Sequence, residues 1–336
     1  MKNQKLLLQK MSGVSLMLLL FLFFSNCAGG GGTFSTDVWN ITYDDQEGGI
    51  SLTYKSKNIC NGMYASYQWE GKEIKTSDYA RHKISTGKVS DSCGKGHIYK
   101  VEYTDKELPE LTQYFYLYPD KEYILTDFTV EAKEEISSAK MAPVNVDSIS
   151  GFLQAGDNRA LFVPFDNDKW IRYQSHPLAF DTLVSYEVTA IFNNESRNGL
   201  VIGSVEHDNW KTAISIGKGM NDNIGSLVCY GGIADEQTRD VKAHGALVGK
   251  KIKSPKVFLG FFEDWCDGLE AYAKANAVIA PPKAWEKAVP FGWNSWGALQ
   301  FNLTYEKAME VSDYFKENLQ NNHFVNPDQT VYIGLD

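Results

Sequence analysis

The sequence predicts a mainly β protein in which a large antiparallel sandwich is followed by a short helix and a strand–helix–strand unit. Over residues 34–263, short segments rich in β-branched and aromatic residues alternate in polarity, and turn-forming residues separate them. After residue 263 the apolar spacing becomes helical, and residues 290–336 then read as strand, helix and strand. Many strands without intervening helices favour an antiparallel sandwich, whereas a strand–helix–strand order favours a parallel pair.

The composition supports a folded core and argues against a nucleic-acid partner. Of the 336 residues, 43% are hydrophobic and 13% aromatic, so the chain can bury a large core. The formal net charge is -9, and no basic stripe is present. Binding to a phosphate backbone needs a cluster of Lys and Arg, so we expect no nucleic-acid partner. The sequence also indicates no cofactor.

The first 27 residues have the layout of a signal peptide. Lys2 and Lys5 precede an apolar run at residues 16–24, and Cys27 follows it closely. This run is shorter than the roughly 20 residues that a membrane-spanning helix needs. A Cys in this place resembles the lipobox of bacterial lipoproteins, which implies cleavage before Cys27, acylation of its thiol and anchoring of an exported protein to the cell envelope. An ordinary signal peptide cleaved nearby is the alternative. Residues 28–33 then read as a glycine-rich tether.

The strands expected in the sandwich, residues 34–263, are separated by turn signals. The clearest are residues 99–103, 111–118, 123–130, 183–192, 200–205, 211–216 and 256–262. Four cysteines remain in the exported part: Cys60, Cys93, Cys229 and Cys266. An oxidising compartment permits disulfides, and four cysteines allow three pairings, but buried free thiols are at least as compatible with the spacing.

The segment after the sandwich changes periodicity twice. Residues 264–277 have helical spacing with Asp264 as a candidate N-cap, and a linker follows up to residue 289. Residues 291–296 read as a short strand. Residues 305–319 read as an amphipathic helix capped by Thr304, and residues 330–335 as a second strand. We therefore expect one βαβ unit with a right-handed crossover.

The most specific string in the chain is Pro-Phe-Gly-Trp-Asn-Ser-Trp-Gly at residues 290–297, and a second is Val-Tyr-Ile-Gly-Leu-Asp at residues 331–336. Together they resemble the first two barrel strands of the α-galactosidase (melibiase) clan of glycoside hydrolases. This resemblance implies that residues 290–336 begin a (β/α)8, or TIM, barrel, which is incomplete here. A large β domain ahead of the barrel, of the β-super-sandwich type, resembles the family 36-like branch.

The resemblance also implies a sugar site. In the family the Trp and Asp that match Trp296 and Asp336 line the subsite for the terminal galactose, and we regard Trp293 and Asn294 as supports. An indole offers a flat apolar wall to a pyranose, and a carboxylate accepts strong hydrogen bonds from two hydroxyl groups. Strand ends at the same face of a barrel would direct both groups into one pocket. Core packing of the tryptophans and an exposed chain end at Asp336 are the alternatives.

Two weaker clusters lie in the sandwich. The loop at residues 165–170 contains Asp166, Asp168 and Trp170. It could bind calcium, project toward the barrel mouth, or form an ordinary hydrogen-bonded turn, which is the simplest interpretation. His207 stands between Glu206 and Asp208 in a predicted hairpin turn. A metal site is conceivable there, but a structural His is the more frequent outcome, and we predict no metal.

The resemblance implies the N-terminal portion of an exo-acting glycoside hydrolase that releases terminal α-galactose from oligosaccharides or polysaccharides. Its two catalytic aspartates lie on later barrel strands in the family, beyond the end of this chain at Asp336, so we expect no hydrolase activity from this chain alone. The implied partners are an α-galactoside, the membrane through a lipid anchor, and further copies of the chain in a homo-oligomer. A surface glycan-binding lipoprotein without catalysis is one alternative, and it would need an exposed aromatic platform within residues 34–262. A related glycosidase with another sugar preference is a further alternative.

Overall fold

The computed structural model describes residues 32–45, 48–166, 171–220, 223–240, 242, 245–286, 289 and 291–336. The chain divides into two compact units between Ile279 and Ala280. The predicted signal peptide, Cys27 and the tether up to residue 31 lie outside the described residues. No helix in the described part of the chain is both long enough and apolar enough to cross a membrane.

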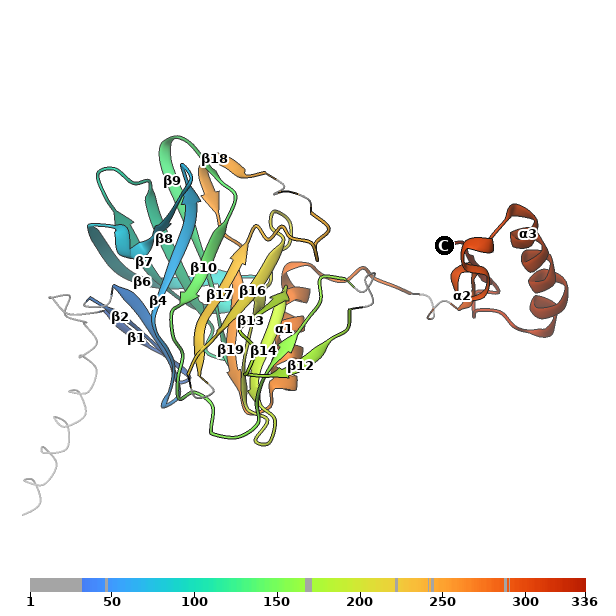
Figure 1. Cartoon of the computed structure of the whole chain (residues 1–336), viewed down its shortest axis with the longest axis horizontal. Helices are drawn as coiled ribbons and strands as arrows, with labels where there is room; N and C mark the ends of the chain where they lie inside the picture. Colours follow the sequence, from blue (N-terminus) through green and yellow to red (C-terminus); the bar gives the residue numbers. More distant parts are fainter. Residues whose placement is uncertain are drawn as a thin grey trace, which may run out of the picture. The chain divides into compact units, whose positions relative to one another are not determined.

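The first unit contains two large sheets whose strands all pair antiparallel (Figure 1). One sheet has nine strands in the order β1-β2-β3-β4-β10-β17-β16-β13, with β5 paired to β4. Its strands are β1 (Thr33–Ser35), β2 (Trp39–Asp44), β3 (Gly49–Tyr54), β4 (Lys57–Trp69), β5 (Lys72–Lys75), β10 (Met141–Val146), β13 (Thr182–Tyr186), β16 (Thr212–Lys218) and β17 (Ile224–Gly231). A single 3-10 turn, η1 (Thr76–Asp78), follows β5.

The other sheet has ten strands in the order β12-β11-β14-β15-β19-β9-β8-β7-β6, with β18 paired to β9. Its strands are β6 (Arg81–Asp91), β7 (Gly94–Thr104), β8 (Glu110–Leu117), β9 (Tyr123–Ser138), β11 (Asn158–Phe162), β12 (Gln174–Pro177), β14 (Val188–Asn193), β15 (Gly199–Ser204), β18 (Leu247–Lys253) and β19 (Val257–Phe262). The prediction of a mainly antiparallel β protein is confirmed.

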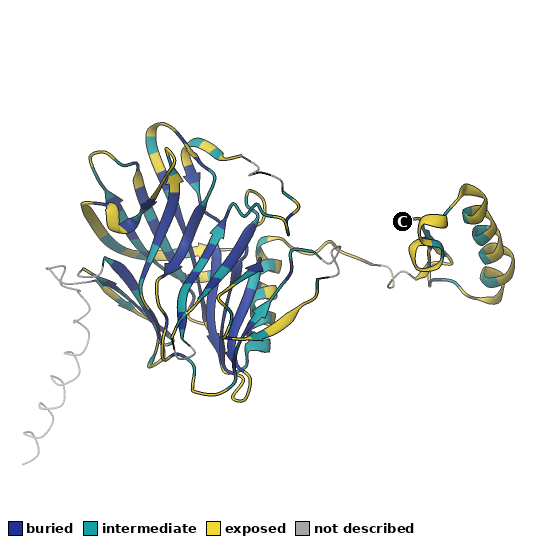
Figure 2. Ribbon diagram, in the orientation of Figure 1, coloured by how far each residue is buried: buried dark blue, intermediate teal, exposed yellow. Residues whose placement is uncertain are grey.

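The main core lies between the two sheets, because alternate residues of each strand point inward. In β2, Trp39, Ile41 and Tyr43 are buried, while the residues between them are half-buried. In β8, Leu111 and Phe115 are fully buried on the same principle. Figure 2 shows this buried band along the middle of the strands of the first unit. Burying this apolar surface is the dominant favourable contribution to folding.

A second, smaller core covers the outer face of the ten-stranded sheet. Helix α1 (Trp265–Ile279) packs on β14, β15 and β19 (Figure 1), where Phe192 stacks on Trp265 and Phe258 lies edge-to-face with Tyr272. Leu125 belongs to the same buried cluster. As predicted, Asp264 caps this helix: its carboxylate accepts the Cys266 N–H at 2.9 Å. The helix therefore belongs to the first unit, although its sequence reads as part of the connection to the second.

All four cysteines in the described residues are free thiols. Cys60 and Cys229 are buried in the core, where desolvation raises the pKa of both thiols, that of Cys60 to about 12. A buried neutral thiol packs as a small apolar side chain and has little reactivity. Of the two outcomes that the sequence left open, the structure has the free thiols.

The segment at residues 183–192, predicted as one strand, is two strands in different sheets. β13 belongs to the nine-stranded sheet and β14 to the ten-stranded sheet, with Glu187 between them. Glu187 has φ of 65°, a left-handed conformation that turns the chain from one sheet to the other. The apolar pattern runs from β13 into β14 with only Glu187 between them, so it does not reveal that the chain changes sheet there.

His207 holds this corner to helix α1. Its Nδ1 lies 2.6 Å from the Glu187 carboxylate, and its Nε2 lies 2.8 Å from Oδ1 of Asn276 on α1. No group of three or more His, Cys, Asp or Glu side chains in the described residues could hold a metal ion. The two contacts of His207 join the Glu187 corner to α1, which is a structural role.

Stability should depend on pH through His207. The hydrogen bond that the Glu187 carboxylate accepts from the His207 ring raises the pKa of His207 above its usual 6.5, although partial burial lowers it. A raised pKa means that the folded state binds the proton more tightly, so the stabilisation is complete below about pH 6.5 and is lost as the pH rises through the folded pKa. Urea unfolding should show that the free energy of unfolding falls more between pH 6 and pH 8.5 in the unaltered chain than in His207→Gln, whose side chain does not titrate. Equal losses in the two proteins would contradict this role.

The second unit contains two short parallel strands with helices between them. They are β20 (Gly292–Asn294) and β21 (Tyr332–Gly334), joined through α2 (Ser295–Leu299), the 3-10 turn η2 (Gln300–Asn302), α3 (Tyr305–Tyr314), the π-helical turn η3 (Phe315–Leu319) and the 3-10 turn η4 (Gln320–Asn322). The predicted strand–helix–strand order is therefore present. A (β/α)8 barrel is not seen in the described residues and stays a prediction.

The second unit has almost no interior. Among its described residues, only Ser295 and Asn326 are buried, and both are polar. Large apolar side chains are exposed instead, including Phe301 at 90% and Tyr305 at 75%. Figure 2 shows the same contrast with the first unit. By itself, this unit buries too little apolar surface to account for its own stability.

Candidate functional site

The site predicted from the two sequence strings lies within the second unit, where β20 and β21 run side by side. Gly292 pairs with Tyr332, Trp293 with Ile333 and Asn294 with Gly334. Gly292 is required by this approach, because a Cβ atom there would lie 1.9 Å from the main-chain oxygen of Tyr332. The Gly of the string thus allows the two strands to come together.

Asn294 ends β20 and begins the next helix. Its Oδ1 accepts the N–H groups of Trp296 at 2.9 Å and of Gly297 at 3.3 Å, so it is the N-cap of α2. The strand is therefore shorter than the predicted range 291–296. The prediction that Trp296 ends the strand is wrong, because Trp296 is the second residue of α2. The cap overrides the β propensity of the tryptophan because it satisfies two free N–H groups of the helix.

Trp296 presents part of its indole to solvent. The side chain is 40% exposed, and its ring lies edge-to-face with Phe301 at 5.0 Å between centroids. Trp293, three residues earlier in the chain, is half-buried and lies on β20, where it pairs with Ile333 of β21. An exposed indole braced by a second ring is a suitable surface for the C–H face of a sugar.

Ser295 connects the two strings directly. Its hydroxyl accepts the Asp336 N–H at 2.8 Å and donates to the Asp336 main-chain oxygen at 3.2 Å. Asp336 therefore lies at the end of β21, beside the start of α2, and its side chain is exposed. The sequence placed Ser295 within the motif but gave it no role, because nothing in a string of letters shows which residue faces Asp336.

Asn326 joins the opposite ends of the same two strands. Its side-chain amide accepts the Phe291 N–H at 3.0 Å and donates to the Phe291 oxygen at 3.1 Å and to the Thr330 oxygen at 2.9 Å. The amide thus substitutes for a strand partner where backbone pairing has not yet begun. Sequence reasoning missed this residue, which lies in a polar loop with the composition of an ordinary turn.

These contacts bring one indole and one carboxylate to the same ends of two parallel strands. A carboxylate can accept hydrogen bonds from two neighbouring hydroxyl groups, and an indole can cover an apolar face. Hydrolysis with retention of configuration would require two carboxylates about 5 Å apart. The connected set Asn294, Ser295, Trp296 and Asp336 contains a single carboxylate. Chemically, this set offers one apolar ring face and one side-chain carboxylate to a ligand.

The loop at residues 165–170 is described only up to Asp166. Asp166 is 3.7 Å from the guanidinium of Arg239, and the Phe165 ring lies edge-to-face with Tyr186 at 5.8 Å. Asp168 and Trp170 lie outside the described residues, so the choice among calcium site, turn and approach to the barrel remains a prediction.

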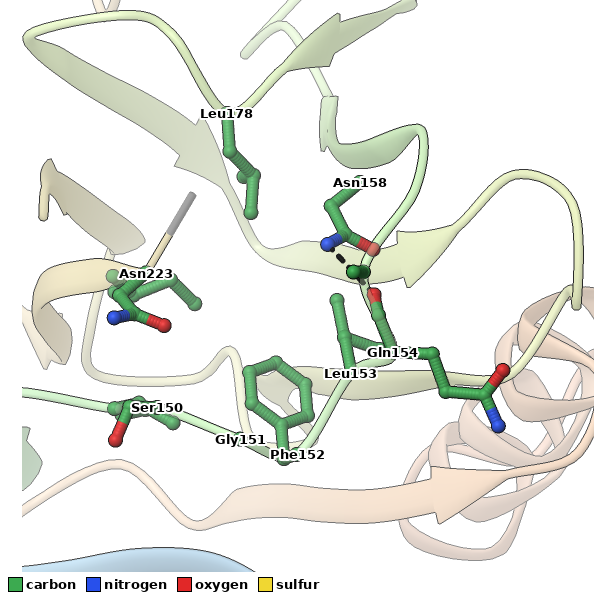
Figure 3. Close-up of a pocket in the computed structure, with 11 residues that line it drawn as sticks. Ser150, Gly151, Phe152, Leu153, Gln154, Asn158, Leu178 and Asn223 are labelled. Carbon is green, nitrogen blue, oxygen red and sulfur yellow. Dashed lines mark hydrogen bonds between the residues drawn. The ribbon is translucent and has the colours of Figure 1, made fainter. Parts of the chain in front are cut away.

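A cavity of about 210 Å³ lies elsewhere in the first unit. Phe152, Leu153 and Leu178 line it, and the Asn158 amide beside them donates to the main-chain oxygen of Gln154 at 3.0 Å (Figure 3). The remaining lining residues are Ile149, Ser150, Gly151, Ala155, Asn223 and Ile224. None of the predicted site residues is among them. Polar side chains, namely Ser150, Gln154, Asn158 and Asn223, share its lining with the apolar ones.

The buried carboxylate Asp127 is a separate structural feature. It lies 3.4 Å from Lys253 and 3.5 Å from Lys256, and the Tyr116 hydroxyl donates to it at 3.3 Å. Burial raises the pKa of Asp127, and the two lysines oppose that rise. Because its surroundings are packed side chains, we assign it to the stability of β8, β9 and β18 rather than to chemistry.

The alternative of a glycan-binding sandwich needs an aromatic platform on the first unit. Among the described residues of 34–262, Tyr173 at 68% is the one exposed aromatic side chain. The other described large rings in this range are buried or half-buried, and the half-buried Tyr114 and Tyr116 stack with 6.3 Å between their ring centroids. The glycan-binding alternative stays a prediction.

Comparisons with known proteins find similarity of fold among solved structures. No family model and no curated protein sequence matches the chain. Among solved structures, a variant of the GH36 alpha-galactosidase AgaA from Geobacillus stearothermophilus, in complex with 1-deoxygalactonojirimycin, aligns with a TM-score of 0.50 at 12% identity and covers 85% of this chain and 48% of its own.

Two further structures resemble the chain less closely. The galactosidase domain of the alpha-galactosidase-sucrose kinase AgaSK aligns at 11% identity with a TM-score of 0.49, covering 84% of this chain and 48% of that one. The alpha-N-acetylgalactosaminidase NagBb from Bifidobacterium bifidum aligns at 9% identity with a TM-score of 0.46, covering 72% and 38%. The chain thus spans about half the length of the alpha-galactosidase structures. The likeness to AgaA shows a fold like that of the matching part of this GH36 alpha-galactosidase.

Proposed function

We propose that the chain is the N-terminal portion of an exo-acting glycoside hydrolase that releases terminal α-galactose. The observation that carries this proposal is the position of Trp296 and Asp336 at the same ends of two parallel strands, where β/α barrels have their active sites. The ordered string at residues 290–297 and the fold shared with the alpha-galactosidase AgaA support it. In this proposal the indole of Trp296 stacks on galactose and the carboxylate of Asp336 binds two of its hydroxyl groups.

The exposed apolar side chains of the second unit support the barrel part of the proposal. Phe301 and Tyr305 are almost fully exposed, and the unit buries no apolar side chain among its described residues. Two parallel strands have unpaired edges on both sides. Further βα units would cover these edges and supply the two catalytic carboxylates. Reading the coding DNA beyond the codon for Asp336 tests this: an open frame that encodes such strands is expected, and an immediate stop codon would contradict it.

The sugar-binding part can be tested on this chain directly. In an isotope-labelled chain, methyl α-D-galactoside should shift the indole N–H signal of Trp296, and the glucoside, which differs only at C4, should shift it less. Trp296→Ala should weaken galactoside affinity about tenfold, because stacking of an aromatic ring contributes on the order of 1 kcal/mol or more. Tyr305→Ala removes another exposed ring of the same unit and should leave the affinity unchanged.

Two results would overturn this assignment of the subsite. One is the absence of any galactoside-dependent shift, and the other is an equal affinity for Trp296→Ala and the unaltered chain. The purified chain should not turn over p-nitrophenyl α-D-galactoside, because the connected site residues provide one carboxylate where two are needed. Measurable hydrolysis would show that the catalytic groups have been assigned to the wrong part of the protein.

Export and lipid anchoring through Cys27 complete the proposal. A signal-peptide layout followed by Cys27 supports it. Mass spectrometry of the mature N-terminus from the membrane fraction should find a diacylated Cys27, and Cys27→Ser should release the protein from the membrane. A free N-terminus at another residue would support an ordinary signal peptide instead.

A further inference from the structure

The contact between Ser295 and Asp336 has an unusual form. The Ser295 side chain has 0% exposure, and its one hydroxyl both accepts the Asp336 N–H and donates to the Asp336 main-chain oxygen. A residue held at its N–H and at its carbonyl has little freedom to rotate its backbone. The direction in which the Asp336 side chain leaves the strand is thereby restricted.

The contact lies where ordinary strand pairing stops. The last backbone pair between the two strands is Asn294 with Gly334. Beyond it, β20 turns into α2, because Asn294 caps that helix. Asp336 would then have no hydrogen-bonding partner on the side of β20. The Ser295 hydroxyl bonds its N–H and its main-chain oxygen in place of a partner strand. Ser295 is also the residue directly before Trp296, so the residue that holds the Asp336 backbone is the immediate neighbour of the residue that carries the indole.

We infer that Ser295 is a positioning residue of the sugar site: its hydroxyl sets where the Asp336 carboxylate lies relative to the Trp296 indole. This inference rests on the proposed galactose subsite. A sugar contacted by both groups requires the carboxylate and the ring at a set spacing, and a displacement of either reduces affinity. A small residue with a hydroxyl is needed, because the site is fully buried and two hydrogen bonds must be made there.

Ser295→Ala removes both hydrogen bonds without adding volume. Loss of hydrogen bonds in a buried position should displace Asp336 and weaken methyl α-D-galactoside binding about tenfold. The amide proton of Asp336 should shift upfield and exchange faster, which reports the lost contact independently of the sugar. Ser312→Ala is the matched control, because Ser312 lies in the same unit and its hydroxyl donates only to the helix, at the Ala308 oxygen. It should change neither quantity.

A double-mutant cycle separates positioning from general support. If Ser295 acts through Asp336, then Ser295→Ala should cause no further loss of affinity in an Asp336→Ala background. The inference would be overturned if the affinity losses of Ser295→Ala and Asp336→Ala add in the double variant. It would also be overturned if Ser295→Ala alone leaves the galactoside affinity unchanged. If Ser295→Ala does not fold, Ser295→Cys, which keeps the size but bonds weakly, takes its place with the same criteria.

Failure of the inference is distinguishable from failure of the proposed function. If the unaltered chain binds no galactoside, the proposed subsite is wrong and the inference falls with it. If the unaltered chain binds and the Ser295 variants bind equally well, the subsite stands and only the positioning role is overturned.

Discussion

Replacing Gly292 with alanine should separate β20 from β21 and unfold the second unit. The added Cβ would lie 1.9 Å from the Tyr332 main-chain oxygen and under 3 Å from two further backbone atoms, so no flexible side chain can move aside. Forcing extra atoms into a packed site costs about 1–3 kcal/mol. Among the described residues of this unit, Ser295 and Asn326 are the only buried ones, so they form no apolar core that could offset that cost.

Gly297→Ala provides the control for this prediction. It adds the same methyl group to the same string, but nothing lies within 4 Å of the new atom. Amide hydrogen exchange should show loss of protection at Trp293 and Ile333 in Gly292→Ala and normal protection in Gly297→Ala. The thermal transition of the first unit should be the same in both. Retained protection at Ile333 in Gly292→Ala would mean that the strands do not pair as described.

Replacing Phe115 with alanine should cause the largest loss of stability in the sandwich. Phe115 is fully buried between the two sheets, with its ring edge-to-face with Tyr99 at 6.2 Å. Deleting a buried phenyl group costs about 3–5 kcal/mol, since the transfer free energy is lost and a cavity remains. For a domain of this size, such a change should lower the melting temperature by roughly 10 °C.

The neighbouring residue in the same strand is the control. Tyr114 has its ring on the opposite face of β8, where it is half-buried against Tyr116. Tyr114→Ala should cost only about 1 kcal/mol, near the average for a substitution. Thermal unfolding followed by circular dichroism should therefore rank the two variants clearly. Equal losses would indicate that β8 does not have one face in the core.

The two predictions describe two units with different sources of stability. The first unit is held by two apolar cores and should tolerate changes in the second. The second is held mainly by backbone pairing and by the side-chain hydrogen bonds of Asn294, Ser295 and Asn326. If the proposed function is correct, this weakness is a property of an isolated barrel opening rather than of the complete domain.

The strand pattern was the most predictable part of the fold. Alternation of apolar and polar residues is dictated by a sheet with one buried face, so β8 and β9 could be found from the sequence to within a residue at their starts. Helices α1 and α3 were found in the same way, with Asp264 and Thr304 as their caps. Local periodicity contains this information because each residue's burial depends on its own position in the element.

The break at Glu187 and the early end of β20 were not predictable from local pattern. In each place two structures compete for the same residues, and the apolar pattern does not show which one forms. At Glu187 the chain leaves one sheet for the other, and at Asn294 a side-chain cap ends a strand in favour of a helix. Periodicity in both places continues across the boundary, so a longer strand is the natural expectation.

The sequence by itself determined the class of fold, the order of its parts and the identity of the two strings that contain Trp296 and Asp336. These follow from periodicity and from an ordered motif, which are properties of neighbouring residues. Only the tertiary structure decided which residues join the two strings: Ser295 faces Asp336 across 41 positions of sequence, and Asn326 faces Phe291 across 35. Such pairings depend on how the strands align in space, and a buried hydroxyl or amide has no periodic signature that would reveal its partner.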